Sequence, residues 1–197
     1  CRYNIFRPVN NILLEICVDL FASAVAAAVG GAHRIELCAG IDSGGVTPSH
    51  GLIRSVCSRL RIPVQVLVRP RLGGFRYSPD ELAIMRKDIQ VAKELGANGV
   101  VFGMLTARGT IDAAAMARLI RAARPMSVTF HRAFDQVRGR GAALATLVEL
   151  GVDRLLTTGG ARTANAGRTP LAEHDERAGE RIAVMAGGGN THSVVAS

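Results

Sequence analysis

The chain lacks tryptophan altogether, and aromatic residues make up only 4% of its 197 residues. Long apolar runs are missing as well. The longest, residues 20–29, is interrupted by Ser23 and falls well short of the roughly 20 residues that cross a bilayer. No charged-then-apolar leader is present, which argues against secretion. These absences predict a cytoplasmic protein that does not enter a membrane.

Lysine is nearly absent, although the formal net charge is +8. Only Lys87 and Lys93 are lysines among the 24 basic residues, and the arginines are scattered rather than gathered into a tract. No aromatic residues alternate with them, as they do in many nucleic-acid-binding segments. We therefore expect the arginines to lie on a solvated surface, and we expect no nucleic-acid partner.

The cysteines form no C-x-x-C pair and are too few for a disulfide-rich scaffold. They are Cys1, Cys17, Cys38 and Cys57. Without a secretion signal, reduced thiols are the expected state. Cys57 lies within a helical pattern and is interpreted as part of the core.

Short β-branched runs alternate with helical stretches rich in alanine and leucine along the whole chain. Seven runs are typical of strands: residues 12–18, 34–38, 64–68, 99–104, 127–131, 154–158 and 182–186. Six helical patterns lie between them: residues 23–29, 50–59, 78–95, 112–123, 141–150 and 169–178. The sequence Ser-Pro-Asp-Glu at residues 78–81 predicts a helix start with a capping box.

Strict alternation of this kind requires a parallel sheet with right-handed crossovers. Seven β/α units without a nucleotide-binding glycine fingerprint favour an α/β fold of the TIM (β/α) barrel type, in a single domain spanning residues 1–197. A closed barrel needs eight strands and typically about 250 residues, so the eighth unit is missing or truncated. The last helical pattern has Leu171 as its only large apolar residue. We therefore expect the C-terminal part to be the least stable.

Acidic residues and thiols recur at matched positions of the first two strands. Side chains alternate along a strand, so Glu15 shares a face with Cys17, and Glu36 shares a face with Cys38. If the strands are neighbours, the two carboxylates form one inward layer and the two thiols the layer above it. Paired thiolates suit a soft ion such as Cu(I). The alternative is that both cysteines are small buried apolar side chains.

His131 ends the fifth predicted strand, at the carboxyl end of the barrel. There it is a candidate acid/base, a metal ligand or a hydrogen-bonded core residue. Asp135 is placed either to orient His131 or to pair with Arg132.

Two arginines, Arg69 and Arg71, follow the third strand at the same end. They are candidates to bind a carboxylate or phosphate, or to neutralise Glu15 and Glu36.

A glycine-rich loop, Gly187, Gly188 and Gly189, follows the seventh strand. Barrels often bind phosphate at such late loops through exposed backbone N–H groups, although tight turns need glycine as well. The loop is therefore a candidate phosphate-binding loop.

Several segments together resemble the signature of the CutC copper homeostasis family, in the same order and spacing. They are residues 13–18, 34–38, 44–49, 69–71, 128–135 and 185–189. The similarity covers essentially the whole chain. It implies a (β/α) barrel, a cytoplasmic homo-oligomer (dimer or tetramer), and Cu(I) binding by cysteines at the positions of Cys17 and Cys38. The family's mouth of Glu, Arg, His and Asp residues looks more like that of an enzyme than that of a chaperone.

Three departures from the family pattern matter. Where the family usually has an Asp after the Arg-Pro-Arg loop, this chain reads Gly73-Gly74-Phe75, so an acidic group at the mouth is lost. The passage from the last helix to the seventh strand is weakly apolar. The eighth unit is absent, which removes one wall of the pocket.

Three hypotheses about function follow. The first is a copper homeostasis protein that binds Cu(I) through Cys17 and Cys38. The second is a barrel enzyme acting on a small anionic substrate, phosphorylated or not. Its candidate catalytic residues are Glu15, Glu36, Arg69, His131 and Asp135. The third is a structural or interaction fragment.

Overall fold

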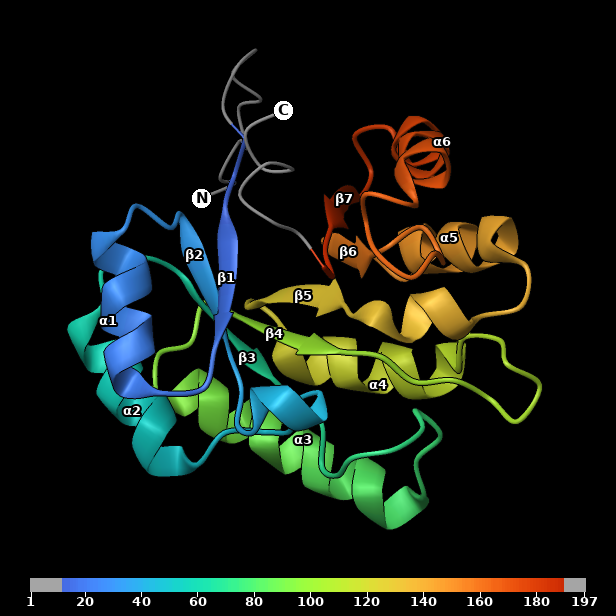
Figure 1. Ribbon diagram of the computed structural model, residues 1–197. Helices are drawn as coiled ribbons and strands as arrows, with labels where there is room; N and C mark the ends of the chain where they lie inside the picture. Colours follow the sequence, from blue (N-terminus) through green and yellow to red (C-terminus); the bar gives the residue numbers. More distant parts are fainter. Residues whose placement is uncertain (1–11, 190–197) are drawn as a thin grey trace.

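The computed structural model of the chain describes residues 12–189, which form one parallel sheet with helices around it (Figure 1). The strands are β1 (Glu15–Val18), β2 (Arg34–Leu37), β3 (Val64–Leu67), β4 (Gly99–Phe102), β5 (Ser127–Phe130), β6 (Arg154–Thr157) and β7 (Ala183–Ala186). The α-helices are α1 (Phe21–Val29), α2 (His50–Arg59), α3 (Pro79–Glu94), α4 (Ala113–Ala123), α5 (Arg140–Glu149) and α6 (Arg168–Ala178). Two 3-10 helices, η1 (Ile41–Ser43) and η2 (Arg132–Gln136), follow β2 and β5.

The strands pair in the order of the chain, β1 to β7, and every pair is parallel. The sheet curls, with the helices on its outer side and with β1 and β7 as its two end strands (Figure 1). Arg34 on β2 reaches across the inside of the curl to Met185 on β7, with 3.0 Å between Nη2 and Sδ. The described residues thus form an incompletely closed (β/α) barrel, as predicted.

Alternate strand residues pack outward against the helices and form the main core. Val100 and Phe102 of β4 are fully buried, as are Met85 and Ile89 of α3. All four residues of β3 and of β4 are buried, which explains their nearly continuous apolar sequence. Within residues 12–189, no helix is both long and apolar enough to cross a bilayer.

The predicted elements are all present, with ends that differ from the sequence pattern by a few residues. The capping box of α3 is confirmed: Ser78 Oγ accepts a hydrogen bond from the N–H of Glu81, and the Glu81 carboxylate accepts one from the N–H of Ser78. The 3-10 helices were not predicted, because a single short turn leaves no periodic pattern. In α6 the buried residues are His174 and Ala178, in line with its weak apolar pattern. Cys1 lies outside the described residues.

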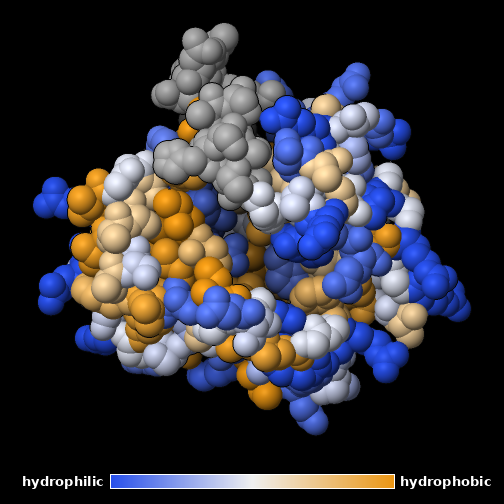
Figure 2. Space-filling model, in the orientation of Figure 1, coloured by the Kyte–Doolittle hydropathy of each residue, from blue (hydrophilic) through white to orange (hydrophobic). Residues whose placement is uncertain are grey.

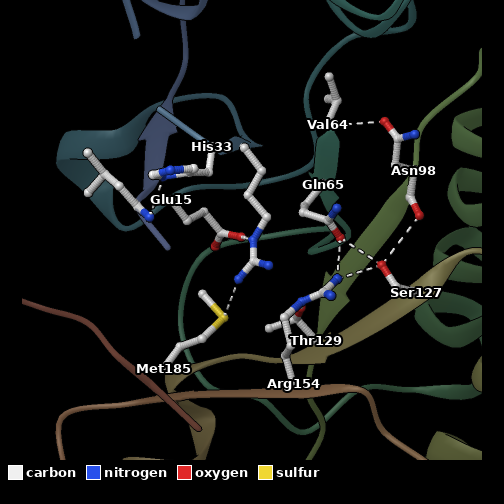
Figure 3. Close-up of polar contacts among 11 residues, drawn as sticks. Glu15, His33, Val64, Gln65, Asn98, Ser127, Thr129, Arg154 and Met185 are labelled. Carbon is white, nitrogen blue, oxygen red and sulfur yellow. Dashed lines mark hydrogen bonds and ion pairs between the residues drawn. The ribbon is translucent and has the colours of Figure 1, made fainter. Parts of the chain in front are cut away.

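Polar side chains fill the inside of the barrel at the amino-terminal ends of the strands (Figure 3). Arg154 on β6 donates from Nε to Thr129 Oγ1 (3.1 Å), and from Nη2 to Gln65 Oε1 (2.8 Å) and Ser127 Oγ (2.5 Å). Gln65, Thr129 and Arg154 are buried. Because buried polar groups are costly unless they are hydrogen-bonded, this network holds β3, β5 and β6 together.

Because Gly99 on β4 has no side chain, there is room beside it for the side chains of this network. A Cβ atom at this position would lie well inside the contact distance of Gln65 Oε1 and Ser127 Oγ. Any larger residue therefore has to displace side chains that are already hydrogen-bonded.

We expect Gly99→Ala to lower the free energy of unfolding by about 1–3 kcal/mol, the usual effect of overpacking a filled core. Gly51→Ala is the control, because a Cβ on exposed Gly51 in α2 meets no atom within 4 Å. It should raise the free energy of unfolding by about 0.5–1 kcal/mol, since alanine favours helix. Urea unfolding followed by circular dichroism measures both changes. An unchanged value for Gly99→Ala would contradict this packing.

Candidate functional site

The two candidate thiols meet at the inner side of β1 and β2. The Sγ atoms of Cys17 and Cys38 are 3.7 Å apart, within reach of an S–H···S hydrogen bond. Cys17 is exposed, whereas Cys38 is buried with 1% of its surface accessible. The pair therefore has one sulfur open to solvent and one inside the barrel.

The layers predicted for these two strands are wrong. Glu15 lies opposite Arg34 rather than Glu36, and Cys17 lies opposite Glu36. The reason is that parallel strands in a barrel are staggered, so equivalent positions of successive strands do not share a level. The thiols still converge, because Cys38 lies one pleat beyond Glu36 on the same inner face.

The loop between β2 and α2, residues 38–49, folds back over Cys38 and shields it from solvent. Ala39 and Val46 form an antiparallel bridge that closes the loop. A Cβ atom on Gly45 would lie 2.9 Å from Leu67 Cδ2 and 3.4 Å from the Cβ of Cys38. Gly45 also has a φ of 76°, so the position requires glycine for space and for backbone conformation.

Electrostatics distinguish the two thiols. The hydrogen bond to Cys38, burial, and the neighbouring Glu36 and Glu15 raise the pKa of Cys17. The same hydrogen bond lowers the pKa of Cys38, against the opposing effects of burial and of Asp19. Cys38 is therefore the sulfur that ionises first, with Cys17 as the hydrogen-bond donor.

The candidate metal donors are the two sulfurs alone. Within residues 12–189, no group of three or more His, Cys, Asp or Glu side chains is placed to hold a metal ion. Structural zinc sites are almost always four-coordinate, whereas soft sulfur ligands select Cu(I) at lower coordination. The donor set fits Cu(I) better than zinc.

Glu36 is a buried carboxyl beside the thiols, with 7% of its surface accessible. Burial first, and then the charges of Glu15 and Cys38, raise the pKa of Glu36 to about 8. The side chain is therefore largely protonated at neutral pH, and it has a proton to donate.

Arg69 holds two loops in place and forms no ion pair with the described residues. Its Nη1 donates to the carbonyl oxygens of Gly44 (2.7 Å) and Gly45 (2.9 Å), and its Nη2 donates to that of Gly73 (2.8 Å). The ring of Phe75 lies 5.1 Å from the guanidinium carbon. Arg69 is buried, with 8% of its surface accessible.

Of the two roles predicted for Arg69 and Arg71, the neutralisation of Glu15 and Glu36 is wrong. The ion-pair partner of Glu15 is Arg34, from the adjacent strand. Arg71 pairs with Glu81 at the start of α3. The strand stagger brings Arg34 level with Glu15, and this could not be deduced from the position of Arg69 or Arg71 in the sequence.

His131 follows β5 and caps η2. Its Nδ1 accepts a hydrogen bond from the N–H of Ala133 (3.2 Å), and its Nε2 is buried without a partner among the described residues. Burial lowers the pKa of His131 to about 4, and the charge of Arg69 acts in the same direction. The ring is therefore neutral at pH 7, with its proton on Nε2. Phe75 packs against it, with 4.7 Å between ring centroids.

Asp135 fixes the loop after β6, and the hydrogen bonds of His131 do not involve it. Its carboxylate accepts hydrogen bonds from the N–H groups of Thr158 (3.1 Å) and Gly160 (3.1 Å) and from the Thr157 hydroxyl. It also pairs with Arg132, at 3.0 Å. Of the two predicted roles, pairing with Arg132 is confirmed and orienting His131 is wrong, because loop N–H groups occupy the carboxylate.

The glycine loop after β7 lies beside this end of the barrel. The N–H of Gly187 donates to the carbonyl of Thr157 (3.1 Å), so it is not free for a ligand. A Cβ atom on Gly188 would lie 2.9 Å from Nη1 of Arg132. Phosphate binding by Gly187, Gly188 and Gly189 stays a prediction.

A cavity of about 130 Å³ brings several of these residues together. Its walls are formed by Glu36, Gly44, Leu67, Arg69, Phe75, His131, Arg132 and Leu156. Figure 2 shows the molecule hollowed near the middle of one face, with apolar surface on the side of α1 and hydrophilic surface opposite. A larger recess of about 230 Å³ lies outside the barrel, between α3 and α4, and contains none of the candidate residues. Size alone therefore does not identify the site.

Glu36→Gln tests the buried carboxyl. An unfolded glutamate has a pKa near 4.3, whereas that of Glu36 in the folded state is about 8. The stability that this proton provides is complete below the unfolded pKa and is lost as the pH rises toward the folded one. Between about pH 5 and pH 8, the wild type should therefore lose on the order of a few kcal/mol relative to Glu36→Gln. Denaturant unfolding at both pH values measures this loss, and parallel pH curves would contradict it.

Residues 12–196 match the model of the CutC family. The chain is 49% identical over 183 residues to a CutC family protein of Bacteroides fragilis, covering 91% of this chain and 72% of the relative. It is 49% identical over 182 residues to the copper homeostasis protein cutC homolog of Homo sapiens, covering 92% of this chain and 67% of that relative.

A crystal structure of CutC from Streptococcus agalactiae matches with a TM-score of 0.88 at 33% identity, covering 92% of this chain and 90% of that one. An aldolase called QR15 matches with a TM-score of 0.67 at 14% identity, over 90% of this chain and 80% of that one, which shows a shared fold alone. The family model and the relatives agree along nearly the whole sequence, and the chain belongs to the CutC family.

Proposed function

We propose that this protein binds Cu(I) through Cys17 and Cys38 and serves in copper homeostasis. The observation that carries the proposal is the 3.7 Å separation of the two sulfur atoms. The name of the human relative, copper homeostasis protein cutC homolog, points in the same direction.

Sulfur is the type of ligand atom that a soft monovalent ion prefers. The distance between the two Sγ atoms has to increase slightly when the ion binds. Two metal–sulfur bonds of roughly 2.3 Å placed in line would set the sulfurs roughly 4.6 Å apart. Cys17 lies on β1, an end strand that pairs with β2 only among the described residues, and its side chain is exposed. It can therefore move outward by about 1 Å and also provides the entry for the ion.

Proton release accompanies binding, because thiolates rather than thiols are the ligands. Cys38 supplies the first thiolate, and the metal has to displace the proton of Cys17. We expect this chemistry in the cytoplasm, where thiols stay reduced, and in a homo-oligomer whose subunits each form one domain.

Cys17→Ser and Cys38→Ser should each abolish tight Cu(I) binding, because one sulfur cannot make a two-sulfur site. Cys57→Ser is the matched control. This third thiol lies in α2, is partly buried and packs against the main core, so its replacement should leave the affinity intact. Competition against a Cu(I) chelator measures all three variants. Undiminished binding by the Cys17→Ser, Cys38→Ser double variant would contradict the assignment.

A second candidate function is that of a barrel enzyme acting on a small anion. The observation that favours it is the cavity, where Arg69 and His131 lie in one wall with Glu36. Arg69 supplies a fixed positive charge, His131 a neutral ring with a proton on Nε2, and Glu36 a buried acid. These are the groups that bind an anion and exchange protons with it.

Arg69→Ala and His131→Ala should each weaken anion binding by about 1.5–3 kcal/mol, the usual contribution of a hydrogen bond to a charged group. Arg86→Ala, on the exposed side of α3, is the control and should change nothing. Isothermal titration with small anions measures the affinities, and unfolding curves of each variant show whether the loops held by Arg69 remain ordered. Equal binding by all variants would remove the support for this second function.

A further inference from the structure

A second buried histidine, His174 in α6, has no hydrogen-bond partner for either ring nitrogen among residues 12–189. Only 5% of its surface is accessible. Its ring lies edge-on to that of Phe134, with 5.5 Å between the ring centroids. An imidazole carries at least one N–H, and buried donors in folded proteins are almost always satisfied. A water or a ligand is therefore needed beside His174.

The first turn of α5 has unused donors of its own. Its N-cap is Gly139, which has no side chain that could accept from the helix. The N–H groups of residues 140–142 have no acceptor within the described part of the chain. The free N–H groups and the dipole of a helix favour an anion at its amino end. A helix start alone is not a binding site, so the side chains around it decide.

Helix α6 lies beside α5 and turns the face with His174 and Arg177 toward that first turn (Figure 1). These two residues are three apart, so they lie on the same side of α6. A Cβ atom on Gly141, the second residue of α5, would lie 3.1 Å from Nη1 of Arg177. Burial lowers the pKa of His174, and the charges of Arg140 and Arg177 act in the same direction, as they do when they are close to the ring. The imidazole of His174 therefore lies at the start of α5, near both guanidinium groups.

The charges at this junction favour an anion. Nε of Arg140 is buried without a partner, and its guanidinium makes one hydrogen bond, from Nη2 to the carbonyl of Asp135 (3.3 Å). The exposed guanidinium of Arg177 has no hydrogen bond or ion pair with the residues that the structure describes. Of the nearby carboxylates, that of Asp135 pairs with Arg132, and that of Glu173 is exposed. The two guanidinium groups thus outnumber the one unpaired carboxylate.

The number of donors indicates a phosphate group rather than a carboxylate. Three helix N–H groups, two guanidinium groups and one imidazole N–H lie at the junction. A carboxylate offers two oxygens to them. A phosphate monoester offers three strong acceptor oxygens and about −1.5 to −2 charges at pH 7. Helix N-termini and arginine forks are the groups that bind phosphate in many proteins.

We propose that the junction of α5 and α6 binds a phosphate group, with the N–H groups of residues 140–142, the guanidinium groups of Arg140 and Arg177, and a ring nitrogen of His174 as donors. The exposed side chain of Arg177 provides the way in, because it can change rotamer. None of these residues lines the cavity of the second candidate function or belongs to the thiol pair. The site is therefore independent of both functions proposed above.

Three probes test the site in the wild-type chain: inorganic phosphate, glycerol phosphate and acetate. By NMR, phosphate should shift the amide signals of residues 140–142 and the ring signals of His174. It should bind at least roughly tenfold more tightly than acetate, because each charged hydrogen bond that acetate cannot make contributes about one order of magnitude. Phosphate-induced shifts at Arg69 and His131 instead would place the anion in the cavity and overturn the site at α5.

Glycerol phosphate carries the same group as an ester and distinguishes the two sources of phosphate. If it binds as tightly as inorganic phosphate and shifts the same signals, the ligand class is a phosphorylated small molecule. If only inorganic phosphate shifts them, the ligand is the free ion. Both results support the site, whereas shifts by neither compound would contradict it.

Two substitutions remove side-chain donors one at a time. Arg177→Gln changes an exposed residue and should weaken phosphate binding by roughly tenfold or more. His174→Phe keeps an aromatic ring against Phe134 and should weaken it to a similar extent. Arg118→Gln is the matched control, since it removes one exposed positive charge from α4 on the side of α3. It should bind phosphate as the wild type does, and isothermal titration measures all three.

Equal affinities of Arg177→Gln and Arg118→Gln would mean that overall charge attracts the phosphate, and the junction would lose its role. Wild-type affinity in His174→Phe would mean that a water satisfies the histidine, which also overturns the site. Should His174→Phe fail to fold, the ring signals of His174 in the wild type decide the same point. Ring signals that saturating phosphate leaves unchanged would exclude the histidine as a donor.

Discussion

Every buried polar group inside this barrel needs a partner, and the way that need is met organises the molecule. At the amino-terminal ends of the strands it is met in full by Arg154, whose guanidinium bonds to Gln65, Ser127 and Thr129. Three strands are thereby tied to one charged side chain, where many barrels have apolar layers. Because a network of this kind is costly when partly broken, it fixes one end of the barrel and leaves the other end free to carry function.

The carboxyl ends of the strands show the opposite situation. Glu36, Arg69 and His131 are buried there, and Nε2 of His131 has no hydrogen-bond partner among residues 12–189; such groups are typical of sites that bind ligands. The thiol pair and the cavity share one structural element, since Gly45 lies against Cys38 and its carbonyl accepts from Arg69. A substitution in this loop is therefore expected to affect both the thiol pair and the cavity.

Much of this arrangement could be predicted from the sequence, because it depends on local patterns. Strand alternation identified the inner faces of Glu15, Cys17 and Glu36, and the Ser-Pro-Asp-Glu start located α3. The predictions that were wrong depend on strand register and on loop conformation. The stagger that sets Cys17 opposite Glu36 is a property of the closed sheet and leaves no trace in either strand alone. The hydrogen bonds by which Arg69 and Asp135 hold their loops could not be predicted either. Their partners are backbone groups, and every residue type has these.

In the proposed copper site, two sulfur atoms from neighbouring strands hold one copper ion. X-ray absorption at the copper K-edge of the Cu(I)-loaded protein tests it most directly, because the scattering reports the kind and number of atoms around the metal. We expect two sulfur atoms around the copper, supplied by Cys17 and Cys38. A shell of nitrogen or oxygen atoms, or a two-sulfur shell that persists when both cysteines are serine, would contradict it.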